Sequence, residues 1–205
     1  MQLGEMALVK TGLVLSRKKA EFEHETKATY KLLTLKNISD DGTIDSTIYD
    51  KFNSKDLLDD HYFTQEGDVL IRLSYPNTAV YIDEASRGLL IPSYFAIIKV
   101  DKSRILPEFL AWYLNSNEVK KEFERFQSGS RIPSTNQNVI KTLPVSVTTI
   151  EKQNVLIDIY KLHVKEKDLY RMLIEEKEKW FAGLSKQILH KSEDNHGWKG
   201  NATTN

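Results

Sequence analysis

The longest regular pattern of apolar and polar positions lies near the C-terminal end of the chain. Apolar side chains recur there at steps of three and four residues, the spacing of one face of an α-helix. The stretch contains no proline and consists mostly of strong helix formers. The pattern predicts one helix over Ile150–Leu189, longer than a usual globular helix. Its apolar stripe consists of Val155, Ile159, Leu162, Leu169, Leu173, Trp180 and Leu184.

Two carboxylates, Glu166 and Glu176, fall on the same stripe. Charges inside an apolar helix seam select the partner and the register at some cost in stability. A helix folded back on its own domain would also bury such a stripe, but the upstream part of the chain is too small to cover all of it. We therefore interpret the stripe and its two carboxylates as an interface with another helix or subunit.

Upstream of this helix, short strand-like runs precede the helical patterns, an order that is typical of an α+β domain. We expect a domain at 1–149, the long helix at 150–190 and a disordered polar tail at 191–205. The expected strands are the first part of Leu3–Leu15, Lys31–Leu35, Val69–Leu73, Ala79–Ile82, Leu89–Ile91, Tyr94–Val100 and Leu143–Val147. The expected helices are Lys55–His61 with Ser54 as its cap, Glu108–Asn115, Asn117–Gln127 and a short one opened by Asn136.

Composition narrows the class of protein. The apolar fraction of 40% supports a real core, yet no apolar run approaches the length of a membrane span. The 205 residues contain no cysteine, which excludes disulfides, thiolate zinc sites and cysteine nucleophiles. The first residues lack the pattern of a secretory signal, so we expect a cytoplasmic protein.

Charge is distributed unevenly, although the formal net charge is zero. Residues 40–68 hold nine acids and two lysines, whereas residues 69–145 hold ten cations and seven acids. Because carboxylates repel phosphates, we expect the acidic segment to face away from any nucleic acid. A second small basic cluster is formed by Arg17, Lys18 and Lys19.

No catalytic motif occurs in the sequence. The chain lacks glycine-rich phosphate loops and an Asn-Pro-Pro-aromatic methyltransferase signature. His24, His61 and His163 show no paired metal-ligand spacing. The Glu-x-Lys pattern that starts at Glu175 is explained better by a solvated helix face than by a nuclease site. We expect neither a catalytic residue nor a bound metal.

Several short motifs, in their order and spacing, resemble the specificity (S) subunit of type I restriction-modification systems. GDVLI follows a predicted short helix, IPSYFAIIKVD precedes ILPEFLAWYLNS, and QSGSRIPSTNQNVIKTLPVSV precedes EKQ at the start of the long helix. The resemblance extends from Leu3 to Ile188. Family members typically carry two target-recognition domains, each followed by a helix, so this chain resembles a half-length form. It departs from the family at Val147–Ile150, where a proline-rich entry is usual.

The resemblance implies a DNA-recognition subunit without its own catalytic centre. In the family, methyltransferase (M) subunits bind S-adenosylmethionine and a restriction/translocase (R) subunit joins some complexes, so we expect no cofactor in this chain. The implied partners are double-stranded DNA, an M subunit and a second copy of the chain. An antiparallel homodimer would restore two recognition domains and read an interrupted palindrome. A coiled-coil adaptor with a protein-binding head is the alternative function.

Three segments are candidates for DNA contact. A first loop follows the GDVLI strand, where Arg and Asn side chains can form bidentate contacts with bases. A second loop leads into the short helix after residue 127, where hydroxyls, amides and backbone N–H groups suit phosphates. The third is the basic cluster, and each segment also fits an ordinary polar loop. The candidates are Arg72, Ser74, Tyr75 and Asn77 in the first loop, Ser128, Ser130, Arg131, Ser134, Asn136 and Asn138 in the second, and Arg17, Lys18 and Lys19 in the cluster.

Overall fold

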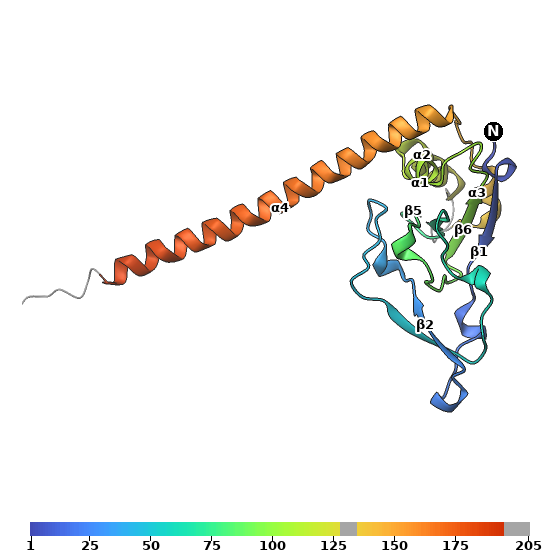
Figure 1. The fold of residues 1–205 in the computed structure, drawn as a ribbon, viewed down its shortest axis with the longest axis horizontal. Coiled ribbons are helices and arrows are strands. Elements are labelled where there is room, and N and C mark those ends of the chain that lie inside the picture. The colour runs from blue at the N-terminus through green and yellow to red at the C-terminus, as the bar shows by residue number, and fades with distance from the viewer. Residues whose placement is uncertain (128–134, 195–205) are drawn as a thin grey trace, which may run out of the picture. The chain divides into compact units, whose positions relative to one another are not determined.

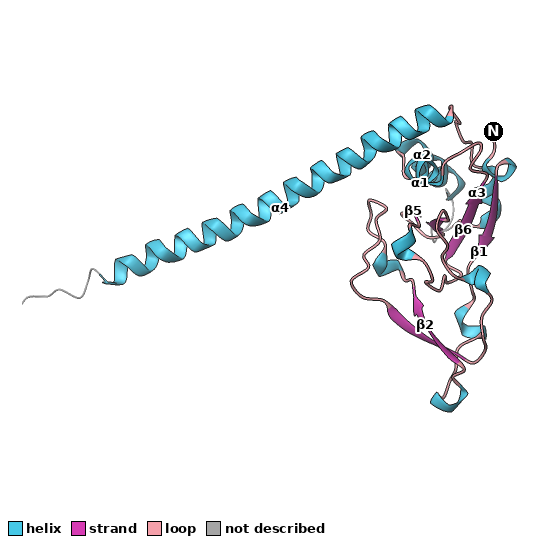
Figure 2. Ribbon diagram, viewed as in Figure 1, coloured by secondary structure: helices cyan, strands magenta, loops and turns pink. Residues whose placement is uncertain are grey.

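The chain consists of a mixed α and β globular unit and a long C-terminal helix, which confirms the predicted α+β class (Figure 1; Figure 2). The computed structural model describes residues 1–127 and 135–194. Its contacts separate Met1–Ile157 from the residues that follow. The strands are β1 (Ala7–Thr11), β2 (Ala28–Leu32), β3 (Asp50–Ser54), β4 (Val69–Arg72), β5 (Ala79–Tyr81) and β6 (Phe95–Val100). The helices are α1 (Pro107–Leu114), α2 (Asn117–Gln127), α3 (Gln137–Thr142) and α4 (Ile150–Asp194). Short 3-10 turns are η1 (Leu3–Glu5), η2 (Leu15–Arg17), η3 (Glu23–Glu25), η4 (Leu35–Asn37), η5 (Asp60–Tyr62) and η6 (Glu84–Ser86).

Four strands form an antiparallel sheet in the order β1-β6-β4-β5, and β2 pairs separately with β3. Thr11, the last residue of β1, and Ile71, near the end of β4, both pair with Ala96 of β6. The segments that follow β1 and β4 therefore leave the sheet at the same end, which we call the loop end of the sheet. This topology brings the basic cluster after β1 and the first loop after β4 to the loop end of the sheet.

The central strands are apolar on both sides because both faces of the sheet are covered. Val69 and Ile71 pack on the face covered by the helices, whereas Leu70 packs on the opposite face with Leu33 and Ile97. Successive side chains of a strand point to opposite faces. A strand covered on both faces is therefore a continuous apolar run, which explains the GDVLI pattern.

The long helix is confirmed, and it continues to Asp194. The predicted disordered tail is therefore wrong at residues 191–194, and residues 195–205 lie outside the described part of the chain. Gln153 and Ile157 in the first turns are buried with the globular unit, so the division of the chain falls later than residue 149. No helix in the described ranges is both long and apolar enough to cross a membrane.

Ser54 does not cap a helix, which corrects the prediction for residues 55–61. It ends β3, and the chain then forms only the short turn η5. The Ser54 hydroxyl donates to the carbonyl oxygen of Lys18 at 3.3 Å, and the backbone N–H of Lys55 donates to the same oxygen at 2.9 Å. Pairing with a distant segment takes up these groups, so tertiary contacts override the local cap signal.

Two predicted strands in the first hundred residues differ in the structure: one begins and ends earlier than predicted, and the other is not formed. The run 31–35 ends as β2 at Leu32, after which the chain enters η4. In the run 89–91, Leu90 forms isolated bridges to Leu32 and to Phe63. These two partners come from different segments of the chain, so neither pairing extends into a ladder.

The three short helices α1, α2 and α3 are confirmed to within one residue at each described boundary. The predicted strand at residues 143–147 is not formed. Pro144 makes an isolated bridge to Gln2, and the N–H of Val145 donates to the carbonyl oxygen of Met1 at 2.8 Å. Proline has no N–H group for a ladder, which limits the pairing to these contacts.

Candidate nucleic-acid interface

Arg72, predicted to contact bases, forms hydrogen bonds within the globular unit instead. Its side chain is 11% exposed, and its guanidinium donates to the carbonyl oxygens of Leu35 and, at 2.7 Å, Ile38. The carboxylate of Asp40 lies 4.0 Å away. These contacts attach the end of β4 to the segment after η4, so the guanidinium is not available to a base edge.

Asn77 is buried as well, although the sequence predicted an exposed turn. It is 2% exposed and has a φ of 52°, in the left-handed region that asparagine tolerates better than most residues. Its side-chain amide donates to the carbonyl oxygen of Arg72 at 3.1 Å. We therefore remove Asn77 and Arg72 from the candidate base contacts.

Lys120 of α2 closes the same turn. Its Nζ donates to the carbonyl oxygens of Pro76 at 2.5 Å and Asn77 at 2.8 Å. Burial, followed by repulsion from the nearby Arg72 guanidinium, lowers the pKa of Lys120 to about 8. Hydrogen bonds from Lys120 therefore hold the backbone of the turn against α2. Tyr75, which is 66% exposed, is the side chain of the turn that faces solvent.

The end of the second loop adjoins the first loop. The backbone N–H of Thr135 donates to the carbonyl oxygen of Leu73 at 2.7 Å, directly before the half-buried Ser74. Asn136 caps α3, because its side-chain oxygen accepts a bond from the N–H of Asn138 at 2.9 Å. Asn136 and Asn138 are exposed. The other candidates of this loop, Ser128, Ser130, Arg131 and Ser134, lie outside the described residues.

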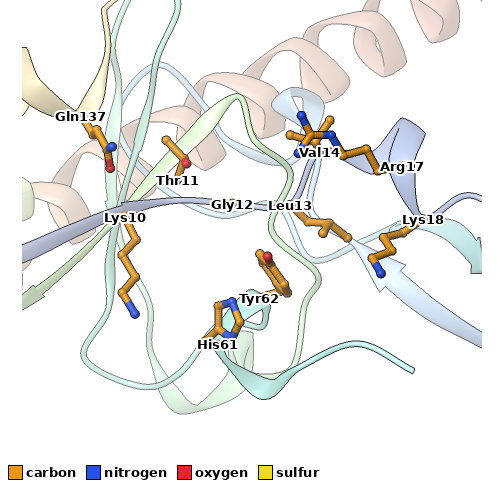
Figure 3. A pocket seen from close by; sticks show the side chains of 10 residues that line it. All are labelled: Lys10, Thr11, Gly12, Leu13, Val14, Arg17, Lys18, His61, Tyr62 and Gln137. Carbon is orange, nitrogen blue, oxygen red and sulfur yellow. The ribbon is translucent and has the colours of Figure 1, made fainter. Parts of the chain in front are cut away.

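A basic pocket of about 450 Å³ lies at the loop end of the sheet (Figure 3). It forms where β1 continues into η2, and η5 and the first residue of α3 contribute to its lining. It therefore joins part of the basic cluster to the helix opened by the second loop. The lining residues are Lys10, Thr11, Gly12, Leu13, Val14, Arg17, Lys18, His61, Tyr62 and Gln137.

Gly12 allows β1 to cross closely over the chain at residues 91–92. A Cβ atom on this residue would lie 2.3 Å from the carbonyl oxygens of both Ile91 and Pro92, closer than atoms can approach. Beside it, the N–H of Leu13 donates to the carbonyl oxygen of Ile91 at 2.7 Å. This close crossing places η2, with Arg17 at its end, along the wall of the pocket.

The charge of the basic pocket comes mainly from Lys10 and Arg17. None of its lining residues is acidic, and both of these side chains belong to exposed residues. Lys18 instead forms an ion pair with Asp56, with Nζ and Oδ2 2.9 Å apart. The hydrogen bond between them is the first cause that raises the pKa of Lys18 and lowers that of Asp56. Lys18 therefore adds less positive charge to the pocket than its sequence suggests.

A second pocket, of about 470 Å³, has mixed charge. Asp60, Glu84 and Arg87 contribute to its lining, and Arg87 is bound to Glu84 at 2.7 Å. Carboxylates at a surface disfavour a phosphate. The basic pocket is therefore the better candidate for contact with a nucleic acid.

The acidic segment 40–68 does not form one separate face. Asp68 is buried and ion-paired. Asp40 and Asp56 lie against cations that the sequence proposed for DNA contact. These three carboxylates compensate nearby cations within the globular unit, and the expectation that the segment faces away from DNA stays a prediction.

Several pocket residues were absent from the predicted candidates. Strand alternation places Lys10 on an exposed position of β1, but no sequence signal brings it near His61, Tyr62 or Gln137. Lys19, which was predicted, does not line the pocket and bridges to Ser54. Among the described residues, no three His, Asp or Glu side chains converge as a metal site requires.

The predicted interface of α4 is open to solvent. Glu166 accepts a bond from the hydroxyl of Tyr170 at 3.3 Å, and Glu176 is bound to Lys179 at 2.7 Å, both on the same helix. An apolar stripe of this length without cover is typical of a protein interface. Its apolar members, all exposed, are Val155, Ile159, Leu162, Leu169, Leu173, Trp180 and Leu184.

The structure is similar to solved S subunits of type I restriction-modification systems. A chain from a structural study of type I system assembly and conformational transition matches 100% of this chain and 50% of its own length, with a TM-score of 0.66 and 14% identity. The HsdS subunit from Thermoanaerobacter tengcongensis matches 100% of this chain and 50% of its own, with a TM-score of 0.62 and 14% identity. The S subunit from M. genitalium matches 87% of this chain and 42% of its own, with a TM-score of 0.50 and 12% identity.

No protein-family model and no curated protein matches the sequence. The chain spans about half the length of the solved chains it resembles. It therefore has the fold of one half of an S subunit, as the order of its sequence motifs predicted.

Proposed function

We propose that this chain is the DNA sequence-specificity component of a type I restriction-modification complex. The observation that carries the proposal is the match of the whole chain to half of an S-subunit structure. The loop end of the sheet supports it, since exposed polar and aromatic side chains lie there beside a basic pocket.

Within this interface, the basic pocket would bind the DNA backbone. Lys10 and Arg17 supply charge, and Tyr62 and Gln137 supply neutral hydrogen-bond donors, all of which suit phosphate oxygens. The exposed Tyr75, Asn136 and Asn138 would then reach base edges, together with the second-loop residues predicted from sequence. Lys18 and Lys19 contribute less, because one is ion-paired and the other does not line the pocket.

The chain would supply recognition, and partner subunits would supply the chemistry. The polar lining of the basic pocket is dominated by cations and hydrogen-bond donors, which suit the binding of an anion. An M subunit would bind S-adenosylmethionine and transfer its methyl group, and an R subunit would join where DNA is cleaved. Such a complex would act on DNA in the cytoplasm.

Assembly would rest on α4. Its exposed stripe would pair with a second copy of the chain, so that two globular units each read one half-site of an interrupted palindrome. An M subunit would bind the remaining helix surface, where Glu166 and Glu176 help to set the register. A C2 interface satisfies an apolar stripe that this chain leaves uncovered.

The test is binding of the purified chain, with and without an M subunit from the same source, to a randomised duplex library at several salt concentrations. We expect enrichment of a two-part palindrome and a steep dependence of affinity on salt. The double variant Lys10→Ala/Arg17→Ala should reduce the slope of log K against log salt by about 1.8, since each phosphate contact contributes about 0.9. Arg87→Ala, in the pocket of mixed charge, is the control and should leave the slope unchanged.

Two results would contradict the proposal. An unchanged slope in the double variant would remove the basic pocket from the DNA interface. Failure to enrich any sequence, with the M subunit present, would favour the coiled-coil adaptor.

A further inference from the structure

We infer that the outer face of the ladder formed by β2 and β3 binds phosphates of double-stranded DNA, with Lys31 and Lys51 as its main contacts. The inference rests on the proposed function and adds a surface outside both the three candidate segments and the basic pocket. It makes β3 an exception to the expectation that the acidic segment 40–68 faces away from DNA. The register of the two strands, their exposed residues and the charges around them carry the inference.

The register of the two strands brings two lysines directly together. β2 and β3 form an antiparallel ladder apart from the four-stranded sheet (Figure 2), and Lys31 pairs with Lys51. Both residues are exposed. Like charges directly opposite one another on a ladder are destabilising. A negatively charged ligand bound to both lysines would offset this repulsion.

The outer face of the ladder is polar throughout. Successive residues of a strand point to opposite sides, and exposure alternates along β2 from Thr29 and along β3 from Lys51. Thr29 pairs with Asn53, and its hydroxyl donates to the side-chain oxygen of Asn53 at 2.9 Å. The alternation continues to one exposed lysine just outside each strand. The outer face therefore consists of Lys27, Thr29, Lys31, Lys51, Asn53 and Lys55.

The opposite side of the ladder is packed against the globular unit. Leu32 and Phe52 are buried together with Leu90. The rings of Tyr30 and Phe63 lie 5.0 Å apart, measured between their centroids. Side chains carried by a packed element are presented in a defined arrangement. The backbone that carries the two central lysines is therefore fixed before any ligand binds.

Neither central lysine is neutralised by a carboxylate in the part of the chain that the structure describes. Lys31 and Lys51 form no ion pair there. Asp50 precedes Lys51 but pairs with the buried Leu32, so alternation directs it to the packed side. Burial, and then the charge of Asp50, raise the pKa of Tyr94, which agrees with that direction. The lysine pair therefore keeps its positive charge.

The other end of the ladder adjoins the basic pocket. The carbonyl oxygen of Lys18, a lining residue of that pocket, accepts bonds from the hydroxyl of Ser54 and the N–H of Lys55. The Lys18 side chain binds Asp56, and this hydrogen bond is the first cause that lowers the pKa of Asp56, followed by the charges of Lys27 and Lys55. One carboxylate thus faces three lysines, so the end of the ladder beside the pocket is positive as well.

The chemistry of the outer face fits DNA better than a protein partner. The face contains no aliphatic or aromatic residue, whereas protein interfaces are enriched in aromatic residues and depleted of lysine. Lysine, threonine and asparagine all bind phosphate oxygens. Lys51 and Lys55 lie about 13 Å apart along β3, which is the axial rise of about four base pairs. The face is therefore long enough to contact more than one phosphate.

The salt dependence of DNA binding tests this surface. Because phosphate contacts do not depend on base sequence, the chain with its M subunit is titrated with a duplex of arbitrary sequence and with the target duplex. Lys31→Ala/Lys51→Ala should reduce the slope of log K against log salt by about 1.8 on both. Lys102→Ala/Lys152→Ala removes two exposed lysines elsewhere in the globular unit and is the control of equal charge, which should leave the slope unchanged.

Combination with the pocket variant tests whether the two surfaces act separately. When Lys31→Ala/Lys51→Ala is added to Lys10→Ala/Arg17→Ala, the total reduction of the slope should reach about 3.6, since each phosphate contact contributes about 0.9. A total no larger than that of the pocket variant alone would overturn the second surface.

Lys51→Glu separates the DNA contact from folding. It places opposite charges across the ladder, which favours the pairing of β2 with β3. The urea midpoint of unfolding should therefore not fall, whereas affinity for DNA at low salt should fall about tenfold. A loss of affinity that is explained by a lower midpoint would assign the lysine to folding and overturn the inference.

The outcomes separate this surface from the proposed function. An unchanged slope in Lys31→Ala/Lys51→Ala, with the pocket variant still reducing it, would overturn the surface alone. A loss confined to the target duplex would overturn the assignment to phosphates. Loss of the M subunit without a change of slope would assign the face to a protein instead. If neither the pocket variant nor the ladder variant changed DNA binding, the proposed function would fail as well.

Discussion

The side-chain oxygen of Gln153, in the first turn of α4, accepts a hydrogen bond from the backbone N–H of Leu106 at 2.8 Å. The amide nitrogen of Gln153 donates to the carbonyl oxygens of Arg104 at 3.1 Å and Thr148 at 2.8 Å. The residue is fully buried, and Leu106 is the N-cap of α1. The glutamine of the EKQ motif thus joins the beginning of α4 to the beginning of α1.

Replacement of Gln153 should destabilise the globular unit. Gln153→Leu removes the partner of three backbone groups, and each buried polar group left without a partner costs about 1–3 kcal/mol. We expect the free energy of unfolding to fall by roughly 3 kcal/mol, measured as a lower urea midpoint at unchanged slope. Asn154→Ala, at the exposed neighbouring position, should change it by less than about 0.5 kcal/mol. Equal losses would show that the helix, not the hydrogen bonds of Gln153, is responsible.

Asn77→Ala should reduce stability by roughly 1–2 kcal/mol, because alanine strains the left-handed backbone and removes the bond to Arg72. Asn77→Gly should cost less, since glycine adopts this conformation without strain. Thermal and urea unfolding of both variants measure the difference. Once binding is corrected for the unfolded fraction, neither variant should lose discrimination between DNA targets. Such a loss would return Asn77 to the base-contacting residues.

Tyr75→Ala should weaken DNA binding and leave stability unchanged, the reverse of the effect expected for Asn77→Ala. Its ring is exposed, so the free energy of unfolding should change by less than about 0.5 kcal/mol. DNA affinity should fall, with the ratio between matched and mismatched targets changing more than the salt slope. Tyr75→Phe separates the ring from the hydroxyl. If matched and mismatched targets lost affinity equally, Tyr75 would only position the DNA.

Lys120 should make stability depend on pH above neutrality. Its folded-state pKa of about 8 lies below the usual 10.5, because burial disfavours the charged amine. Between these two values the unfolded chain binds more protons than the folded one, so this residue's contribution to stability rises with pH across the window from about 8 to 10.5. Chemical denaturation of the protein and of Lys120→Met at several pH values isolates the effect, because other groups titrate in both. A constant difference across this range would contradict the lowered pKa.

The ion pair between Lys18 and Asp56 should limit the DNA contact of Lys18. Lys10→Ala should reduce the salt slope by about 0.9, whereas Lys18→Ala should change it less. Asp56→Ala frees the lysine and should increase DNA affinity at low salt, measured by fluorescence anisotropy. Weaker binding of Asp56→Ala would instead indicate that the ion pair orders the pocket.

The sequence by itself determined the elements whose signals are local. The three-four spacing of Leu162, Leu169 and Leu173 depends only on neighbours along one helix, and α4 follows from it. The apolar run of GDVLI likewise determined a buried strand. Where a distant segment competes for the backbone, as Lys18 does at Ser54, the local signal failed.

Only the tertiary structure decided how the polar residues are used. An arginine and an asparagine after a strand suit base contacts and scaffold contacts equally well by residue type. Arg72 became part of the scaffold because the carbonyl oxygens that it binds belong to residues more than thirty positions earlier in the chain. The basic pocket likewise combines Lys10, His61 and Gln137 from three separate segments. Periodicity reflects neighbours a few residues away, whereas burial and hydrogen bonding of a polar side chain depend on groups that meet only when the chain has folded.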